Sequence, residues 1–208
     1  MGTTLTDVER PAAQVSREVT LRDGRTVTIR TMRPADAERS HHFFCSLPPE
    51  DRRYLRVDVT RAELVERRIA EVSGDRVERL VALLGEEIVA DGALELAGHG
   101  WGDNIGEIRL IVARPYQRLV LGTLVARELY LLAVQHQLDR IVARVMRPQV
   151  GAHRIMHRLG FREEFLIPEH VRDQAGDWQD LIIMRCNLDE MWREMEALLE
   201  QSDWRWHR

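Results

Sequence analysis

The segment from Glu107 to Tyr130 constrains the fold more than any other part of this 208-residue chain. Residues 107–112 alternate in the manner of a strand, with Ile108 and its i+2 neighbours on one side. Pro115 ends the strand because proline has no backbone N–H to donate. From Arg118 onward the apolar residues recur at helical spacing. The sequence therefore predicts a strand, a short turn and a long helix.

The predicted turn has the chemistry of a phosphate-binding site. The start of a helix leaves backbone N–H groups without partners, and the helix dipole places partial positive charge at the same point. Gly122 lies near that start and would allow close approach of a ligand to the backbone. An ordinary strand–turn–helix connection that serves only stability is the alternative interpretation.

The turn resembles the phosphate-binding motif of the GNAT superfamily of acyl-CoA N-acyltransferases, Gln/Arg-x-x-Gly-x-Gly/Ala. Gln117 and Gly122 match this motif, whereas Val120 stands at its first glycine. The resemblance implies acetyl-CoA as co-substrate, with the turn holding the pyrophosphate and the strand lying along the pantetheine arm. It assigns the following residues to cofactor binding: Leu110, Ile111, Val112, Gln117, Arg118, Leu119, Val120, Leu121, Gly122, Thr123 and Gln149.

A second stretch, residues 149–161, resembles another GNAT motif, Asn-x-x-Ala-x-x-Leu-Tyr-x-Lys-Leu-Gly-Phe. Gly160 and Phe161 are among the matching positions, and Gln149 replaces the asparagine. Met156 stands where many GNAT enzymes have a tyrosine that protonates the leaving thiolate. Methionine cannot do this, but a coenzyme A thiolate is a fair leaving group, so transfer does not require the acid.

The beginning of the chain is similar to the catalytic domain of bacterial protein-lysine acetyltransferases. The similarity rests on residues 21–30, 33–36, 46–50 and 53–56, and a short helix is expected over Asp51–Arg56. Together the resemblances cover roughly residues 18–186. They imply an α/β (α+β) fold with a mixed, mostly antiparallel twisted sheet and helices on both faces.

Three segments are expected along the chain. Residues 1–16 lack periodicity and predict a flexible tail, residues 17–186 form the GNAT-like domain, and residues 187–208 contain an amphipathic helix. Docking of this helix on its own domain is favoured over a contact in a homodimer. The oligomeric state is therefore predicted only as monomer or homodimer.

Glu107 is the candidate catalytic base. An amine must lose a proton before or during its attack on a thioester, and a carboxylate can accept that proton. Glu107 lies ten residues before Gln117, where related lysine acetyltransferases have a glutamate on the same strand. A half-exposed carboxylate paired with an arginine is the alternative interpretation. Glu95, on the preceding predicted strand, is the second candidate and would act through water.

Composition excludes several other classes of protein. Apolar residues make up 44% of the chain and charged residues 31%, as in soluble globular proteins, and a net charge of −4 argues against nucleic-acid binding. No apolar run suggests a membrane span or a secretion signal. Cys45 and Cys186 permit one disulfide at most, which fits a cytoplasmic protein. The histidines show no metal-ligand spacing, so no metal is expected.

Two functions remain open from the sequence. The first is N-acetyl transfer from acetyl-CoA to a primary amine, either a protein lysine or a small molecule. The second is a degenerate GNAT domain that acts as an acyl-CoA-binding sensor or scaffold without catalysis. All 30 basic residues are arginine, so lysine acetylation cannot modify this chain.

Overall fold

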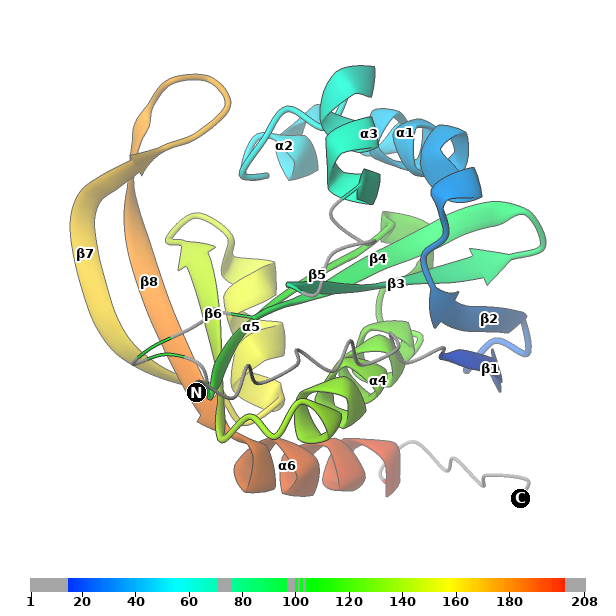
Figure 1. Ribbon diagram of the computed structural model, residues 1–208. Coiled ribbons are helices and arrows are strands. Elements are labelled where there is room, and N and C mark those ends of the chain that lie inside the picture. Colours follow the sequence, from blue (N-terminus) through cyan, green and yellow to red (C-terminus); the bar gives the residue numbers. More distant parts are fainter. Residues whose placement is uncertain (1–14, 71–75, 97–99, 101, 103, 201–208) are drawn as a thin grey trace, which may run out of the picture.

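A single twisted sheet of eight strands runs through the part of the chain that the structure, a computed structural model, describes: residues 15–70, 76–96, 100, 102 and 104–200 (Figure 1). The strand order is β1-β2-β3-β4-β5-β6-β8-β7, and every pair is antiparallel except β5 with β6. The strands are β1 (Ser16–Thr20), β2 (Thr26–Thr31), β3 (Val77–Leu84), β4 (Glu87–Leu96), β5 (Ile105–Val112), β6 (Arg140–Met146), β7 (Arg162–Arg172) and β8 (Trp178–Asn187).

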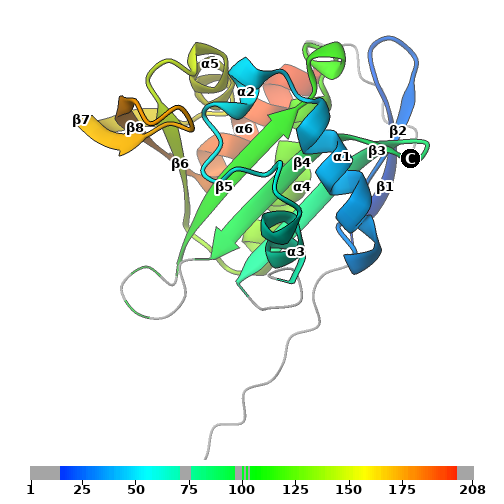
Figure 2. The ribbon, with the colours of Figure 1, turned by 90° about the horizontal axis from the view of Figure 1, so that it is seen from above.

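Helices cover both faces of the sheet, which confirms the predicted fold class (Figures 1 and 2). The helices are α1 (Ala37–Ser46), α2 (Pro49–Arg52), α3 (Ala62–Ala70), α4 (Leu121–Gln135), α5 (Val150–Arg158) and α6 (Leu188–Glu200). The larger core lies between the sheet and α4, α5 and α6, and the smaller one lies under α1 and α3. Residues on the two sides of β4 and β5 therefore belong to different cores.

The centre of the sheet is buried on both sides, so β3 and β4 carry nearly continuous apolar runs. Gly92 of β4 permits the close approach of α4. A Cβ added at this position would lie 2.8 Å from Cγ1 of Val125 and 3.1 Å from Cδ1 of Leu129. The long apolar helix is thus held directly against the strand that borders β5.

Strands β5 and β6 pair over only three residues and then separate. Ile105 lies opposite Arg140, and the last pair joins Glu107 to Val142. Beyond this pair, β5 continues to Val112 on the β4 side and β6 continues on the β8 side. The backbone between them has no ladder partner across the gap, so the sheet opens into a wedge whose apex is Glu107.

The structure corrects both bounds of the short helix after α1. The sequence predicts this helix over Asp51–Arg56, but α2 begins at Pro49 and ends at Arg52. The following carbonyl groups bond to the loop between β7 and β8 instead of continuing a helix, because Gln174 donates from its N–H to Arg53 O at 2.9 Å and from its side chain to Leu55 O at 2.7 Å. This tertiary contact draws residues 53–56 out over the wedge.

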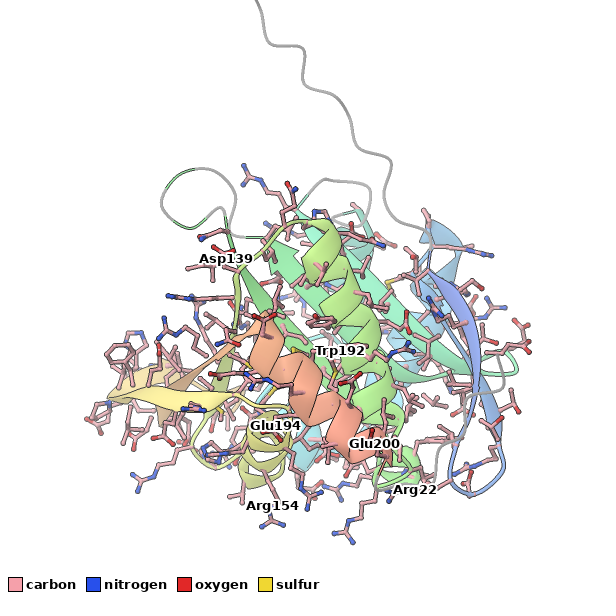
Figure 3. The ribbon with its side chains drawn as sticks, turned by 90° about the horizontal axis from the view of Figure 1, so that it is seen from below. Arg22, Asp139, Arg154, Trp192, Glu194 and Glu200 are labelled. Carbon is pink, nitrogen blue, oxygen red and sulfur yellow. The ribbon has the colours of Figure 1, made fainter. Side chains whose placement is uncertain are left out.

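The C-terminal helix packs on its own domain. Met191 and Met195 of α6 are buried, and Trp192 stacks on Tyr130 of α4 with ring centroids 5.2 Å apart (Figure 3). Residues 1–14 and 201–208 of the predicted tail and C-terminal segment lie outside the described residues. Cys45 is exposed and Cys186 is buried, and both are free. None of the helices in the described ranges has the length and apolar character that a membrane crossing needs.

Candidate active site

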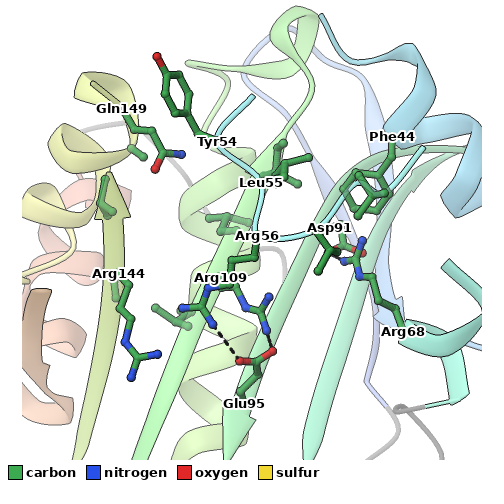
Figure 4. Close-up of a pocket in the computed structure, with 18 of the residues that line it drawn as sticks. Phe44, Tyr54, Leu55, Arg56, Arg68, Asp91, Glu95, Arg109, Arg144 and Gln149 are labelled. Atoms are coloured by element: carbon green, nitrogen blue, oxygen red, sulfur yellow. Dashed lines mark hydrogen bonds and ion pairs between the residues drawn. The ribbon is translucent and has the colours of Figure 1, made fainter. Parts of the chain in front are cut away.

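A cleft of about 470 Å³ lies where β5 and β6 separate (Figure 4). Residues 108–111 of β5 form one wall, and residues 143–145 of β6 with the start of α5 form the other. Helix α3 and the loop after α2 cover the side of the cleft that faces α1. The cleft occupies the part of the wedge in which β5 and β6 are not paired. Its position is therefore a consequence of the short β5–β6 pairing.

The two candidate bases meet at this wedge. Glu95 and Glu107 are directly opposite each other on β4 and β5. Glu107 has the strand phase expected from the sequence, and its side chain is only 13% exposed. It forms ion pairs with Arg56 and with Arg144, the latter with 3.2 Å between Nη1 and Oε2. The carboxylate thus lies at the apex of the wedge, and it is paired with arginine, as in the alternative interpretation of the sequence.

Arginine side chains surround both carboxylates. Glu95 forms ion pairs with Arg109 and, at 3.5 Å, with Arg56 (Figure 4). Burial, followed by repulsion from neighbouring guanidinium groups such as that of Arg56, lowers the pKa of Arg109 to about 9. Burial and the charge of Arg144 likewise lower the pKa of Arg56. The cleft thus crowds positive charge around its two carboxylates.

The turn after β5 has the free donors that a phosphate site needs. Among the residues that the structure describes, no backbone N–H from Arg118 to Thr123 donates to another protein group. Helix α4 begins at Leu121, so its dipole points toward the same turn. The side chain of Gln117 donates to Val112 O at 2.9 Å and ties the turn to the end of β5. Gln117 therefore has a positioning contact, whereas the backbone beside it is available to an anion.

The remaining cofactor-binding candidates divide between cleft and core. Leu110 and Ile111 line the cleft, and so does Gln149, whose side-chain oxygen accepts the N–H of Met146 at 2.8 Å. Val112 is absent from the cleft wall and packs against the core under α4. Leu119 and Val120 also pack against that core, and Leu121 is fully buried in it, so these three can offer a ligand only their backbone.

Residues 40–161 of the chain match the acetyltransferase (GNAT) family. The chain belongs to the GNAT acetyltransferase family. Enzymes of this family are acyltransferases that use acetyl-CoA, so the match identifies the protein as one of them. No curated protein sequence matches the chain. The resemblance seen in the two sequence motifs thus extends over more than half of its length.

Solved GNAT structures share the fold at low sequence identity. RimJ of Mycobacterium smegmatis in complex with CoA-disulfide has a TM-score of 0.70 at 19% identity over 90% of this chain and 95% of its own. The GNAT domain of S. lividans PAT has a TM-score of 0.68 at 18% identity over 83% and 96%. The acetyl-CoA complex of yncA, a putative acetyltransferase from Salmonella typhimurium, has 0.64 at 21% over 79% and 95%. Identities this low establish the common fold only, so the similarity to protein-lysine acetyltransferases does not select an acceptor.

Val120, at the first glycine position of the GNAT phosphate motif, adopts the backbone conformation of a glycine. Val120 is the N-cap of α4 and has φ +71°, a left-handed conformation that favours the glycine of the GNAT motif. A Cβ added at Gly122 would lie 3.7 Å from side-chain atoms of Leu110 and Val112, so this glycine faces β5. Gly122 therefore serves helix–strand packing as well as the turn.

Val120→Gly should relieve this backbone strain. We expect the glycine variant to be more stable than Val120→Ala by about 0.5–1 kcal/mol, because alanine keeps the Cβ that is unfavourable at positive φ. Both variants lose the same packing of the valine side chain, so their comparison isolates the conformation. Urea unfolding measures the difference, and equal stability of the two would contradict the strained geometry. Acetyl-CoA affinity should be retained or raised in the glycine variant.

Met156 occupies another altered GNAT position and is part of the cleft wall. It is 5% exposed and belongs to the main core. His157, its neighbour, is exposed and lies against His153 with ring centroids 5.6 Å apart. The histidine ring is thus engaged on the outer side of α5 and does not replace the family tyrosine.

Sequence reasoning missed the arginines that enter the cleft. Arg56 lay within a stretch already singled out for its resemblance, yet it was expected in a helix rather than over the wedge. Arg68 of α3 and Arg144 of β6 carried no motif signal. Their alternation with apolar residues could have indicated the face on which they lie, but it could not show that distant elements converge on one cleft.

Proposed function

We propose that this protein transfers an acetyl group from acetyl-CoA to a primary amine, with Glu107 as the base. The observation that carries the proposal is the position of Glu107 at the apex of the wedge, in line with a strand that ends at a turn of free N–H groups. Strand geometry places Val112 roughly 16 Å beyond Glu107. One extended ligand can therefore reach from Glu107 to the turn that follows Val112.

The residues of the cleft have distinct roles in this proposal. Acetyl-CoA supplies the acyl group as an activated thioester, and its transfer to an amine releases the free thiol. The N–H groups of residues 118–123 would hold the pyrophosphate, and the unpaired edge of β5 at Leu110 and Ile111 would bond the pantetheine arm. Glu107 accepts the proton that the amine nitrogen loses as it attacks the carbonyl carbon. Its ion pairs with Arg56 and Arg144 hold the carboxylate in place.

A binding protein without catalysis is the second candidate. Met156 removes the family acid, Val120 alters the phosphate turn and Gln149 replaces the motif asparagine, and these changes favour a sensor or scaffold. Glu107, Gln117 and Gly122 favour the enzyme, because a protein that only binds needs no carboxylate at the apex of the wedge. The cytoplasmic location, the absence of a metal and the choice between monomer and homodimer remain predictions from the sequence.

Two measurements on the intact protein test the proposed activity. Calorimetric titration with acetyl-CoA is expected to show binding, and incubation with acetyl-CoA and a panel of amines and lysine-containing proteins is expected to release free thiol. The chain contains no lysine, so its own side chains contribute no lysine background. Binding without amine-dependent thiol release would support the sensor instead, and no binding would contradict both candidates.

A further inference from the structure

We propose that Asp173, in the loop between β7 and β8, is a positioning residue for the acetyl transfer. Its carboxylate binds Arg53, and this contact fixes the loop that places Arg56 against Glu107. The inference rests on the proposed function, because it gives a residue outside the cleft a role toward the proposed base. It follows from the contacts between the hairpin tip, residues 172–180, and the loop after α2.

The Asp173 carboxylate is the centre of a hydrogen-bond network in the hairpin tip. Its side chain is buried and accepts the N–H groups of Ala175 at 2.9 Å and Asp177 at 3.2 Å. The side chain of Gln179 and Nε of Arg53 each donate to the same carboxylate at 2.8 Å. Burial opposes the ionisation of Asp173, but the hydrogen bonds from Arg53 and Gln179 outweigh it and lower the pKa. Asp173 therefore presents a fixed negative charge to Arg53.

Arg53 joins the hairpin tip to the loop that carries Arg56. Its guanidinium also pairs with Asp177 of the tip. The backbone of the loop is held as well, since Gln174 donates its N–H to Arg53 O at 2.9 Å and its side chain to Leu55 O at 2.7 Å. Arg56 therefore follows directly after a residue whose carbonyl group is bound by the hairpin tip.

The segment from α2 to Arg56 spans the open end of the wedge. At its start, Asp51 of α2 accepts two hydrogen bonds from Arg114 of the turn after β5, at 2.9 and 3.0 Å. The pairing of β6 with β8 stops at Leu181, so the hairpin tip extends beyond this pairing and meets the loop after α2 (Figures 1 and 2). The segment is thus attached to the β5 side of the wedge at one end and to the β8 side at the other.

The loop matters for Arg56 because the surroundings of its guanidinium are unfavourable for a cation. Burial, followed by the charge of Arg144, lowers the pKa of Arg56. Charged side chains of β4, β5 and β6 lie around Arg56 and Glu107: Glu95, Arg109 and Arg144. The ion pair with Glu107 offsets the repulsion, and the loop determines whether Arg56 can reach this carboxylate.

Release of the loop would change Glu107 in two ways. The carboxylate would lose one of the ion pairs that hold it in place, which lowers the rate at every pH. It would also lose a positive charge that favours its ionised form, so it would take up a proton at higher pH. The second effect separates a positioning role from a general loss of structure, because partial unfolding lowers activity without changing the pH at which the base titrates.

Asp173→Asn tests the contact in the intact protein. Asparagine keeps the size of the side chain and an oxygen that accepts N–H groups, but it lacks the charge that binds Arg53. We expect kcat of thiol release to decrease by about tenfold, because a small displacement of a group at the reacting centre is costly. The acid limb of the pH profile of kcat should move up by about one pH unit. Acetyl-CoA affinity, measured by calorimetry, should be unchanged, because Asp173 belongs neither to the cleft wall nor to the turn after β5.

Asp177→Asn is the matched control for this variant. It makes the same substitution in the same hairpin tip and removes the other carboxylate that pairs with Arg53. The side chain of Asp177 is 66% exposed, whereas that of Asp173 is fully buried. We expect kcat to change by less than about twofold, since exposed ion pairs contribute little, and we expect no shift of the acid limb.

Arg56→Gln tests whether Asp173 acts through Arg56. It should move the acid limb in the same direction, and adding Asp173→Asn to it should cause no further shift, because both changes remove one charge from Glu107. Shifts that add in the double variant would overturn the role of Asp173. So would an unshifted limb in Asp173→Asn, or an equal shift in Asp177→Asn.

Gln174→Ala is a second variant, which decides the matter if Asp173→Asn does not fold. It removes only an exposed side chain that donates to Leu55 O. The acid limb should move in the same direction by a smaller amount, and again not further when Arg56→Gln is added. An unshifted limb in Gln174→Ala would then overturn the inference.

If the parent protein releases no thiol with any amine, the proposed activity fails, and hydrogen exchange tests the contact instead. Asp173→Asn should accelerate amide exchange at residues 53–56 by about tenfold and leave that of α4 unchanged, because only the loop is released. Parental exchange rates at residues 53–56 would show that Asp173 does not hold the loop and would overturn its positioning role.

Discussion

Glu107→Gln is expected to lower turnover by about 100- to 10,000-fold, the usual contribution of a general base. Glutamine keeps the size of the side chain but cannot accept the proton of the amine. Acetyl-CoA affinity should be nearly unchanged, because the turn proposed to bind the cofactor lies at the far end of β5. Steady-state thiol release measures turnover, and calorimetry measures acetyl-CoA affinity.

The dependence of this loss on pH separates a base from a structural role. An acceptor amine is mostly protonated at neutral pH, and the fraction that needs no base increases as pH rises. The ratio of the turnover of the parent protein to that of Glu107→Gln should therefore decrease as pH rises. A purely structural effect of losing the ion pairs with Arg56 and Arg144 would not follow the titration of the acceptor.

Glu95→Gln is the matched control for Glu107. It removes a carboxylate from the same cross-strand pair and from the same arginine cluster, but from β4 rather than β5. We expect a smaller loss of turnover. A larger loss in Glu95→Gln would assign the base to Glu95, and parental turnover across pH in Glu107→Gln would exclude Glu107 as the base.

Thr123→Asp should weaken acetyl-CoA binding by about 100-fold. Thr123 is the third residue of α4, where an acidic side chain interacts favourably with the helix dipole. The same charge would repel a pyrophosphate bound at the turn, by about 3 kcal/mol for unit charges 5 Å apart at an effective dielectric constant of 20. The substitution is thus expected to preserve or raise stability while it removes binding.

This position gives a cleaner test than the turn glycine. An aspartate at Gly122 would direct its side chain toward Leu110 and Val112 and would damage the packing of α4. Thr123→Asn has the shape of the aspartate variant without its charge and should bind acetyl-CoA with near-normal affinity. Calorimetry and thermal unfolding of both variants provide the comparison, and normal binding by Thr123→Asp would exclude this phosphate site.

Local patterns were sufficient to predict the strands, the main helix and the family. The alternation around Ile108 and the helical spacing after Arg118 are imposed by burial on one face, so they can be read from neighbouring residues alone. The same alternation correctly placed Glu107 on the face opposite Ile108. The positive φ at Val120 was also foreseeable, since the family motif has glycine there.

The sequence by itself therefore determined the order of the elements, and it indicated the turn and the carboxylate that we propose as phosphate site and base. Only the tertiary structure decided that β5 and β6 separate after Glu107 and that the loop carrying Arg56 bends over the gap. Local periodicity cannot encode these features, because they depend on contacts between residues far apart in the chain. Gln174 holds the backbone of Arg53, and arginines from β3, α3 and β6 meet in one cleft. Their charges come together only after folding, since residues far apart in the sequence then line the same cleft.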